Sequence, residues 1–252
     1  MSKFLAGITI LGLIWAVSTA KADDLSVFQK QAISPVIQLA RNCSGTVINV
    51  GDATKTYILT ANHCISDGAA KYGDQKGFIT IDTKNRATLI ETNQYVYDVL
   101  VRDTAVDLAV IKLRKEGLFL NAAKIGKEDP REGEKVWAIG YPLGRTKTVT
   151  EGYMGEYEAL NKDLSDDPLG GEDSSRTMYR ATPAIYGGNS GGALFHKVGD
   201  DYELIGVADA NFRQFFVASF YVPQDEINKI VTRALKSDED KTKKIEQKKQ
   251  ND

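Results

Sequence analysis

The chain has 252 residues, of which 42% are hydrophobic and 26% are charged, and its formal net charge is −2. This composition is ordinary for a globular protein and provides enough chain for one large domain or two small barrels that share a core. Because the charges nearly balance, the composition does not favour an acidic substrate, and we expect no nucleic-acid partner.

The first 22 residues have the pattern of a secretory signal peptide. Lys3 supplies a positive charge, residues 4–17 are apolar, and residues 20–22 (Ala-Lys-Ala) form a small-x-small cleavage signal. The alternative is an uncleaved membrane anchor, but the apolar run is short for a membrane span and contains two glycines. We therefore expect cleavage after Ala22, export to the periplasm or the medium, and no stable membrane anchor.

The rest of the chain is predicted to be mainly β-strand. Residues 23–40 indicate a helical or irregular lead-in with a break near Pro35. From Ser44 onward, short runs of β-branched and aromatic residues alternate with Gly, Asp or Asn clusters. We expect strands at 46–50, 56–61, 78–81, 87–91, 94–102 and 107–113, and at 135–139, 147–151, 177–181, 192–196, 203–208 and 215–222. Two such sets predict an all-β fold of two six-stranded antiparallel β-barrels, at about 41–126 and 134–222.

The C-terminal part changes to a helical pattern. Ile227, Ile230, Val231 and Leu235 form one apolar stripe, which predicts a helix at about 224–236. Residues 237–252 are nearly all charged or amide side chains and have little apolar surface to bury. We therefore predict a charged, disordered tail over these residues.

The chain contains two cysteines, Cys43 and Cys64. An even number in an exported chain indicates a disulfide, and the alternative is two free buried thiols. The two histidines show no paired-ligand spacing for a metal. The acidic segment 163–173 lacks the alternating spacing of a calcium loop and is interpreted as a solvated surface loop. We expect no metal and no other cofactor.

Ser190 lies in the run YGGNSGG, residues 186–192, just before an apolar strand. The glycines permit unusual backbone angles and let a substrate backbone approach without a β-carbon in the way. In such a turn, the amides of Gly188 and Ser190 can form an oxyanion hole for a carbonyl under attack. Taken by itself, the run is also consistent with a Gly-rich hairpin loop.

A serine nucleophile needs a base within hydrogen-bond reach, and histidine has a suitable pKa. His63 follows a hydrophobic strand, whereas His196 ends the strand after Ser190 and is expected at the surface. The base needs an acid that fixes its tautomer. Asp107 opens an apolar strand, where an unpaired acid would be costly. Its competitor Asp103 is interpreted as a turn residue, so we predict a catalytic triad of His63, Asp107 and Ser190.

These motifs, in the chain order His, Asp, Ser, resemble those of the trypsin-like superfamily and in particular the HtrA (Deg) serine proteases. The resemblance runs from about Cys43 to Leu235 and includes ILTANH at 58–63, DLAVIKL at 107–113, AIGYPLG at 138–144 and AIYGGNSGGAL at 184–194. It implies a peptidase domain over residues 23–236 that hydrolyses protein or peptide substrates through an acyl-enzyme. HtrA proteases carry a PDZ domain after the last helix, where this sequence has its charged tail.

The resemblance also implies where the primary specificity pocket lies. Its base is the residue six positions before the nucleophile, Ala184, and one wall is formed by Ala208, Asp209 and Ala210. The small alanines predict a preference for Val, Ala, Leu or similar side chains. If Asp209 points into the pocket, a basic side chain is favoured instead, and strand alternation leaves its direction open.

Two other functions compete with the endopeptidase. A catalytically silent trypsin-like binding module usually lacks a triad member, whereas this chain has all three. A lipase or esterase of the α/β-hydrolase type requires the order Ser, acid, His and alternating strands and helices. The endopeptidase is therefore the favoured function, and no feature of the sequence predicts an oligomeric state.

Overall fold

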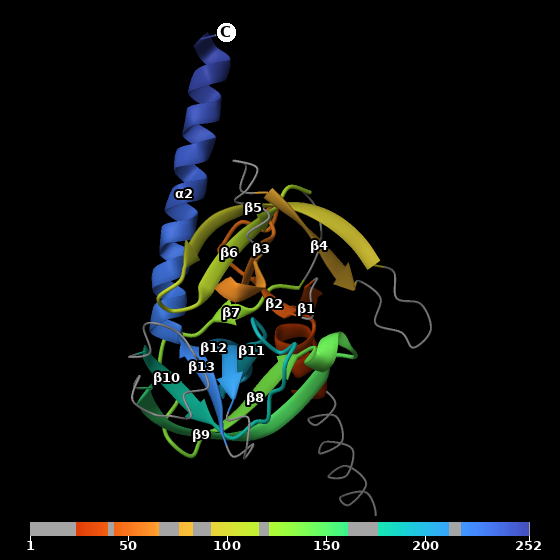
Figure 1. The fold of residues 1–252 in the computed structure, drawn as a ribbon, viewed down its shortest axis with the longest axis vertical. Coiled ribbons are helices and arrows are strands. Elements are labelled where there is room, and N and C mark those ends of the chain that lie inside the picture. The colour runs from red at the N-terminus through yellow and green to blue at the C-terminus, as the bar shows by residue number, and fades with distance from the viewer. Residues whose placement is uncertain are drawn as a thin grey trace, which may run out of the picture.

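The computed structural model describes most of the chain (Figure 1). The residues that it describes are 24–39, 43–65, 76–82, 92–115, 121–160, 176–211 and 218–251. The expected signal peptide at 1–22, the expected strand at 87–91 and the acidic segment at 163–173 lie outside these ranges. Among the described helices, none has the length and apolar character needed to cross a membrane.

The first half of the chain forms a six-stranded antiparallel sheet with the strand order β1-β2-β3-β6-β5-β4. Ile58 and Ile111 pack in a cluster drawn from this half alone. Their neighbours Leu59 and Val110 pack in a second cluster that also includes residues of the other half. Burial on both faces explains the continuous apolar runs. The strands are β1 (Val36–Leu39), β2 (Cys43–Ile48), β3 (Tyr57–Ala61), β4 (Lys76–Asp82), β5 (Thr92–Asp103) and β6 (Leu108–Leu113).

The second half forms a seven-stranded sheet with the order β11-β8-β9-β10-β13-β12-β7. Because β11 also pairs with β12, six of these strands close into a barrel, and β7 is added in parallel on β12. The strands are β7 (Lys124–Ile125), β8 (Lys135–Gly140), β9 (Thr148–Leu160), β10 (Arg176–Ala181), β11 (Ala193–Val198), β12 (Asp201–Asn211) and β13 (Ser219–Pro223).

The predicted all-β fold with a C-terminal helix is confirmed, with one difference in the first sheet. Its end strands β1 and β4 contact each other, but no ladder joins them among the described residues. The pairing therefore closes the C-terminal barrel and leaves the N-terminal sheet open. The two units, which Figure 1 shows side by side, share one apolar cluster to which both contribute residues.

The lead-in before the first sheet is partly helical, as expected. Residues 24–28 are α-helical and continue into the π-helical turn η1 (Gln29–Ile33). The strand β1 then begins at Val36, directly after Pro35, where the sequence pattern had indicated no strand. Ser34 still has helical angles (φ −63°, ψ −39°), but Pro35 has no backbone N–H with which to continue the helix. The helical segment therefore ends there, and the next residues pair with β2.

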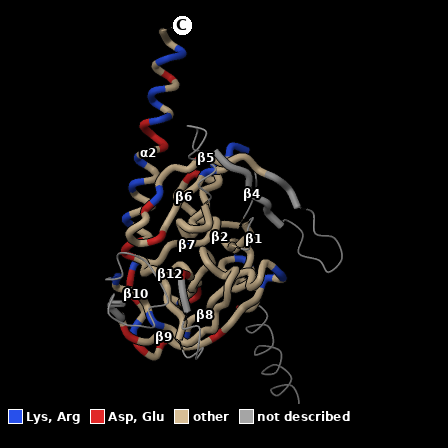
Figure 2. The backbone as a smooth tube through the Cα atoms, in the orientation of Figure 1, with Lys and Arg blue, Asp and Glu red and all other residues tan. Residues whose placement is uncertain are grey.

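The prediction of a disordered tail is wrong for residues 237–251, because helix α2 (Gln224–Asn251) continues through them. Asp238 explains the continuation. Its carboxylate is buried and accepts hydrogen bonds from the Tyr57 hydroxyl at 2.8 Å and the Lys112 ammonium at 2.6 Å. Residues 239–251 are exposed and carry charges of both signs on residues with high helix propensity (Figure 2). The composition therefore correctly indicated the absence of a core, but not the backbone conformation.

Candidate active site

His63 lies in the short 3₁₀ helix η2 (Asn62–Cys64), which follows β3 directly. Both flanking residues are buried, whereas the His63 side chain is 49% exposed. Arg102 on β5 fixes this turn, because its Nε donates to Asn62 Oδ1 at 2.6 Å and its Nη2 donates to the Ile65 carbonyl at 3.3 Å. The imidazole therefore projects from a rigid support towards solvent.

Asp107 occupies the turn between β5 and β6 and makes three contacts with the histidine segment. Its backbone carbonyl accepts the Asn62 amide at 2.9 Å, Oδ1 accepts the His63 amide at 2.9 Å, and Oδ2 lies 2.6 Å from His63 Nδ1. The residue has a left-handed φ of 54°, a conformation that a side chain disfavours and that is retained here by these contacts. The Nδ1 contact leaves Nε2 as the nitrogen available for proton transfer.

The electrostatics of this pair suit a base and its orienting acid. The hydrogen bond to Asp107 raises the pKa of His63, although burial opposes the change. Burial would raise the pKa of Asp107, but hydrogen bonds from His63 and its charge lower it overall. Asp103, the competing acid, instead accepts a hydrogen bond from Arg233 at 2.6 Å and caps its own turn.

Ser190 lies in the turn that precedes β11, and the start of β2 holds this turn in place. The Ser44 amide donates to the Ser190 carbonyl at 2.8 Å, and the Ser44 hydroxyl donates to the Gly188 carbonyl at 2.8 Å. Gly188 and Gly191 have φ angles of 99° and 79°, which favour glycine. The Ser190 backbone also lies beside the histidine segment, since its carbonyl oxygen is 3.6 Å from the sulfur of Cys64.

Two amides of this turn are available to a ligand. The Asn189 amide donates to the Tyr186 carbonyl, and the Gly192 amide donates to the Asn189 carbonyl. Within the described part of the chain, the amides of Gly188 and Ser190 have no acceptor. Two unpaired amides next to a serine can bind the oxygen of a carbonyl that gains negative charge.

Cys43 and Cys64 form a disulfide that joins the start of β2 to η2 across a separation of 21 residues. Closing a loop of this size stabilises a protein by about 3 kcal/mol in the chain-entropy model. The bond links the segment that supports the Ser190 turn to the segment that carries His63. Sulfur atoms in a disulfide are not metal ligands, so the grouping of the two cysteines with His63 does not form a metal site.

Among the described residues, one other group has metal-ligand atoms within 4.8 Å of one another: His63, Asp107 and Asp209. His63 Nδ1 and Asp107 Oδ2 are only 2.6 Å apart and hydrogen-bonded. Two ligands of a tetrahedral ion at about 2.0 Å each lie roughly 3.3 Å apart. The geometry of this group therefore fits a shared proton rather than a bound metal.

Two residues of the predicted specificity pocket, Ala184 and Ala208, line one small cavity together with Asn189. Its volume is about 90 Å³, and its lining is otherwise mostly apolar. The side chain of Ala210 lies outside what the structure describes. Asp209 does not line this cavity and instead approaches His63 and Asp107. The full lining is Ala138, Ile139, Pro142, Thr148, Thr150, Ala184, Ile185, Tyr186, Asn189, Ala193 and Ala208.

The surroundings of Asp209 include a residue that the sequence did not indicate. Arg176, the first residue of β10, places its Nη2 3.2 Å from Asp209 Oδ2. A buried acid at position 209 was a reason to expect a basic partner, but no pattern distinguished Arg176 from the other basic residues. His196 lies elsewhere, on β11, with its Nε2 3.2 Å from the Glu134 carboxylate.

A family model described as a trypsin-like peptidase domain matches residues 43–207. The serine protease Do-like HtrB of Bacillus subtilis is 32% identical over 195 residues, which are 76% of this chain and 38% of that protein. The probable periplasmic serine endoprotease DegP-like of Buchnera aphidicola is 30% identical over 168 residues, which are 66% of this chain and 29% of that protein. The chain thus spans less than half the length of these two curated relatives.

A solved structure of an HtrA-type protease with a tripeptide shares the fold. Its TM-score is 0.60 and its sequence identity is 24%, and the match covers 82% of this chain and 62% of that one.

Proposed function

Because the chain belongs to the trypsin-like peptidase family, we propose that it is a serine endopeptidase with Ser190 as nucleophile, His63 as general base and Asp107 as the acid that orients the base. The contact of 2.6 Å between His63 Nδ1 and Asp107 Oδ2 is the observation that carries the proposal. It fixes the imidazole tautomer and directs Nε2 away from Asp107. The neighbouring Ser190 turn and its unpaired amides give further support.

The proposed reaction proceeds through an acyl-enzyme. His63 Nε2 takes the proton of the Ser190 hydroxyl as the oxygen attacks the peptide carbonyl, and Asp107 stabilises the resulting imidazolium. The amides of Gly188 and Ser190 donate hydrogen bonds to the oxyanion of the tetrahedral intermediate. His63 then gives the proton to the leaving amine as the peptide bond breaks. A water molecule, deprotonated by the same nitrogen, hydrolyses the acyl-enzyme and restores the serine.

We propose that the substrates are proteins or peptides with a small apolar side chain before the cleaved bond. A cavity of about 90 Å³ holds roughly three times the liquid volume of one water molecule, which suits a short aliphatic side chain. Asp209 does not line the cavity, so it does not attract a basic side chain there.

A cleavage-site profile on a denatured proteome tests both the endopeptidase function and this preference. We expect internal cleavage, mainly after Val, Ala or Leu, because the walls are mostly apolar and offer no charge to a lysine or arginine. The control is the same digestion with the Ser190→Ala variant, which should produce no new termini. Cleavage mainly after Lys or Arg would contradict the preference, and the absence of new termini with the wild-type chain would contradict the function.

We also propose that the protein is exported to the periplasm or the medium. Three observations support this: the signal-peptide pattern of residues 1–22, the disulfide between Cys43 and Cys64, and the periplasmic designation in the name of the Buchnera relative. Sequencing of the mature amino terminus tests it, and a terminus at Asp23 is the expected result.

The proposed base predicts a specific pH dependence. His63 accepts a proton only when it is neutral, and its hydrogen bond to Asp107 raises its pKa above the ordinary value of 6.5, although burial opposes this. A raised pKa means that the ring keeps its proton to a higher pH, so activity is lost earlier on acidification. We expect the acid limb of kcat/KM to have its midpoint above 6.5.

Kinetics on one peptide substrate across the acidic and neutral range measure this midpoint. Replacing Glu134, the partner of His196, with Gln serves as the control and should leave the midpoint unchanged. An acid limb centred below the ordinary histidine value would contradict the assignment of His63 as a base stabilised by Asp107.

A further inference from the structure

Asp209 lies beside the triad because β12 is irregular at this position. The residues before and after Asp209 pair with two consecutive residues of β13, Tyr221 and Phe220, so Asp209 is the extra residue between them. A β-bulge of this kind interrupts the alternation of faces and redirects a side chain. The Asp209 carboxyl consequently approaches His63 and Asp107 instead of lining the apolar cavity.

Three charged or titratable side chains face the Asp209 carboxyl, each from a different segment. Arg176 of β10 lies 3.2 Å from Oδ2. His63 of η2 and Asp107 of the β5–β6 turn each place a ring nitrogen or a carboxylate oxygen within 4.8 Å of a carboxylate oxygen of Asp209. On the adjacent strand β13, the Tyr221 hydroxyl donates elsewhere, to a backbone carbonyl at 3.0 Å. The Asp209 side chain is only 6% exposed, so solvent screens these interactions little.

Two carboxyl groups this close together in a buried site do not both ionise readily. His63 keeps Asp107 ionised, since its hydrogen bonds and charge outweigh the effect of burial on the pKa of Asp107. Asp209 is the group that retains the proton. Burial raises the pKa of Asp209 to about 7, while the positive charge of Arg176 opposes the change and the negative charge of Asp107 adds to it. Near neutral pH, Asp209 therefore changes between a hydrogen-bond donor and a second negative charge.

We propose that Asp209 is a positioning residue of the triad: with its proton it donates a hydrogen bond that holds Asp107 against His63, and without its proton it repels Asp107 and loosens that contact. This inference rests on the proposed peptidase function, because Asp107 and His63 act in that reaction. The hydrogen bond from a neutral acid to a carboxylate is among the stronger kinds in proteins. Arg176 makes the ionised state accessible, since its guanidinium partly balances the second negative charge.

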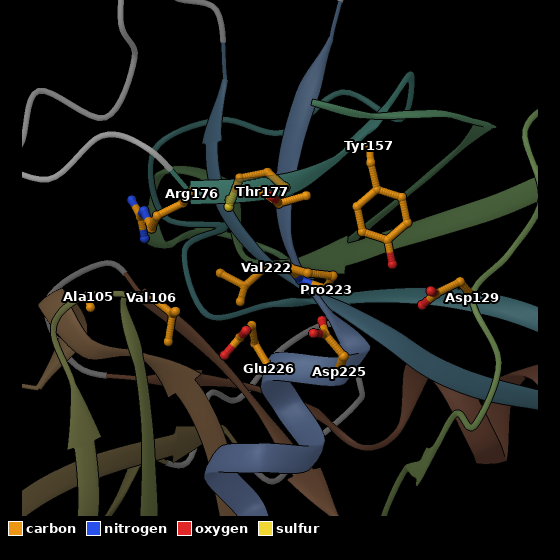
Figure 3. A pocket seen from close by; sticks show the side chains of 11 residues that line it. Ala105, Val106, Asp129, Tyr157, Arg176, Thr177, Val222, Pro223, Asp225 and Glu226 are labelled. Carbon is orange, nitrogen blue, oxygen red and sulfur yellow. The ribbon is translucent and has the colours of Figure 1, made fainter. Parts of the chain in front are cut away.

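Arg176 also connects this group to the surface. It lines a cavity of about 510 Å³ between β10, the β5–β6 turn and the start of α2. Figure 3 shows Arg176 at the same end of this cavity as Ala105 and Val106, with Tyr157 at the other end. Ala105 and Val106 belong to the turn that carries Asp107. Arg176 thus lies between the buried Asp209 carboxyl and this cavity.

The test compares the pH profiles of kcat/KM for the full chain and its Asp209→Asn variant on one peptide. Asparagine has nearly the same size and donates a hydrogen bond through its amide, but it does not ionise. We expect wild-type activity to fall by about tenfold as the pH rises above about 7, because a hydrogen bond to a charged group is lost. The kcat/KM of the Asp209→Asn variant should stay constant over the same pH range.

Two further variants separate positioning from a general structural effect. Asp209→Ala removes the donor, so it should lower kcat by about tenfold with little change in KM, and asparagine should restore the rate. Asp200→Asn changes an exposed acid in the turn before β12 and should match the wild type at every pH. Thermal unfolding monitors the fold of each variant, and if the alanine variant does not fold, the asparagine comparison decides alone.

A measurement that does not require turnover is the NMR titration of the His63 ring, with His196→Gln in both proteins to leave one histidine. We expect the His63 midpoint to move to lower pH in Asp209→Asn, because a neighbouring negative charge is removed. Identical titrations and identical pH profiles in the two proteins would overturn the inference. If the wild-type chain hydrolyses no peptide, the proposed function fails. If the His63 midpoint still moves in that case, the electrostatic coupling of Asp209 to His63 and Asp107 stands.

Discussion

Replacing Ser190 with alanine is expected to reduce kcat/KM on a peptide substrate by about 10⁴-fold or more. The substitution removes the attacking oxygen, and no other group of the turn can form the acyl-enzyme. The loss of a single hydroxyl leaves no sizeable cavity, so the thermal unfolding temperature should stay close to that of the wild type. Hydrolysis of a fluorogenic peptide and labelling by a fluorophosphonate both measure the effect.

The other members of the triad provide the internal comparison. His63→Ala should be nearly as severe as Ser190→Ala, and the double variant should be no worse than either single variant, because the residues act as a unit. His196→Ala is the matched control, since this histidine pairs with Glu134 on another part of the barrel. Unchanged activity in purified Ser190→Ala protein would show that Ser190 is not the nucleophile, whereas no activity in the wild-type chain would favour the catalytically silent binding module.

Replacing Gly191 with alanine should lower the free energy of unfolding and should also inactivate the protein. A β-carbon at this position would lie 2.2 Å from Thr60 Oγ1 and 2.3 Å from the Ser44 carbonyl oxygen, both far inside contact distance. The φ of 79° adds a conformational cost of about 1–2 kcal/mol, and overpacking typically adds about 1–3 kcal/mol. Because Ser190 precedes this glycine, the relief of the clash would displace the nucleophile as well.

Denaturant unfolding measures the loss of stability, and the same peptide assay measures the loss of activity. Gly199→Ala is the matched control, because this glycine has a similar φ of 61° but a β-carbon added there would meet no described atom within 4 Å. The Gly199→Ala variant should lose about 1–2 kcal/mol of unfolding free energy, from the conformational cost alone, and should keep its activity. Equal losses of stability in the two variants would show that the contacts with Thr60 and Ser44 are unimportant.

The sequence was sufficient to predict those elements whose structure and chemistry depend on residues close to one another in the chain. The strands around Ile58 and Ile111 are recognisable because each is a continuous apolar run bounded by polar residues. His63 and Asp107 could be selected because a general base and a buried acid each require a partner, and few residues of the right type were available. The structure brings these two side chains into contact at 2.6 Å.

The features that the sequence did not predict depend on contacts between distant segments. The direction of Asp209 depends on a bulge opposite β13, which shifts the alternation by one residue and leaves no mark in the sequence of β12. The helical continuation through Asp238 depends on its hydrogen bonds to Tyr57 and Lys112, which lie far away in the chain. In both cases a buried carboxylate required a partner, but the identity of that partner follows from the tertiary fold alone.

The outer part of α2 gives this protein a natural point of attachment. Asp238 anchors the helix on the first sheet, and residues 239–251 extend beyond it without burial (Figure 1). At about 1.5 Å per residue, this stretch carries the chain roughly 20 Å from the body of the molecule. A dye, a tether or a fused reporter joined at this end would therefore be held by a helix rather than by a flexible linker.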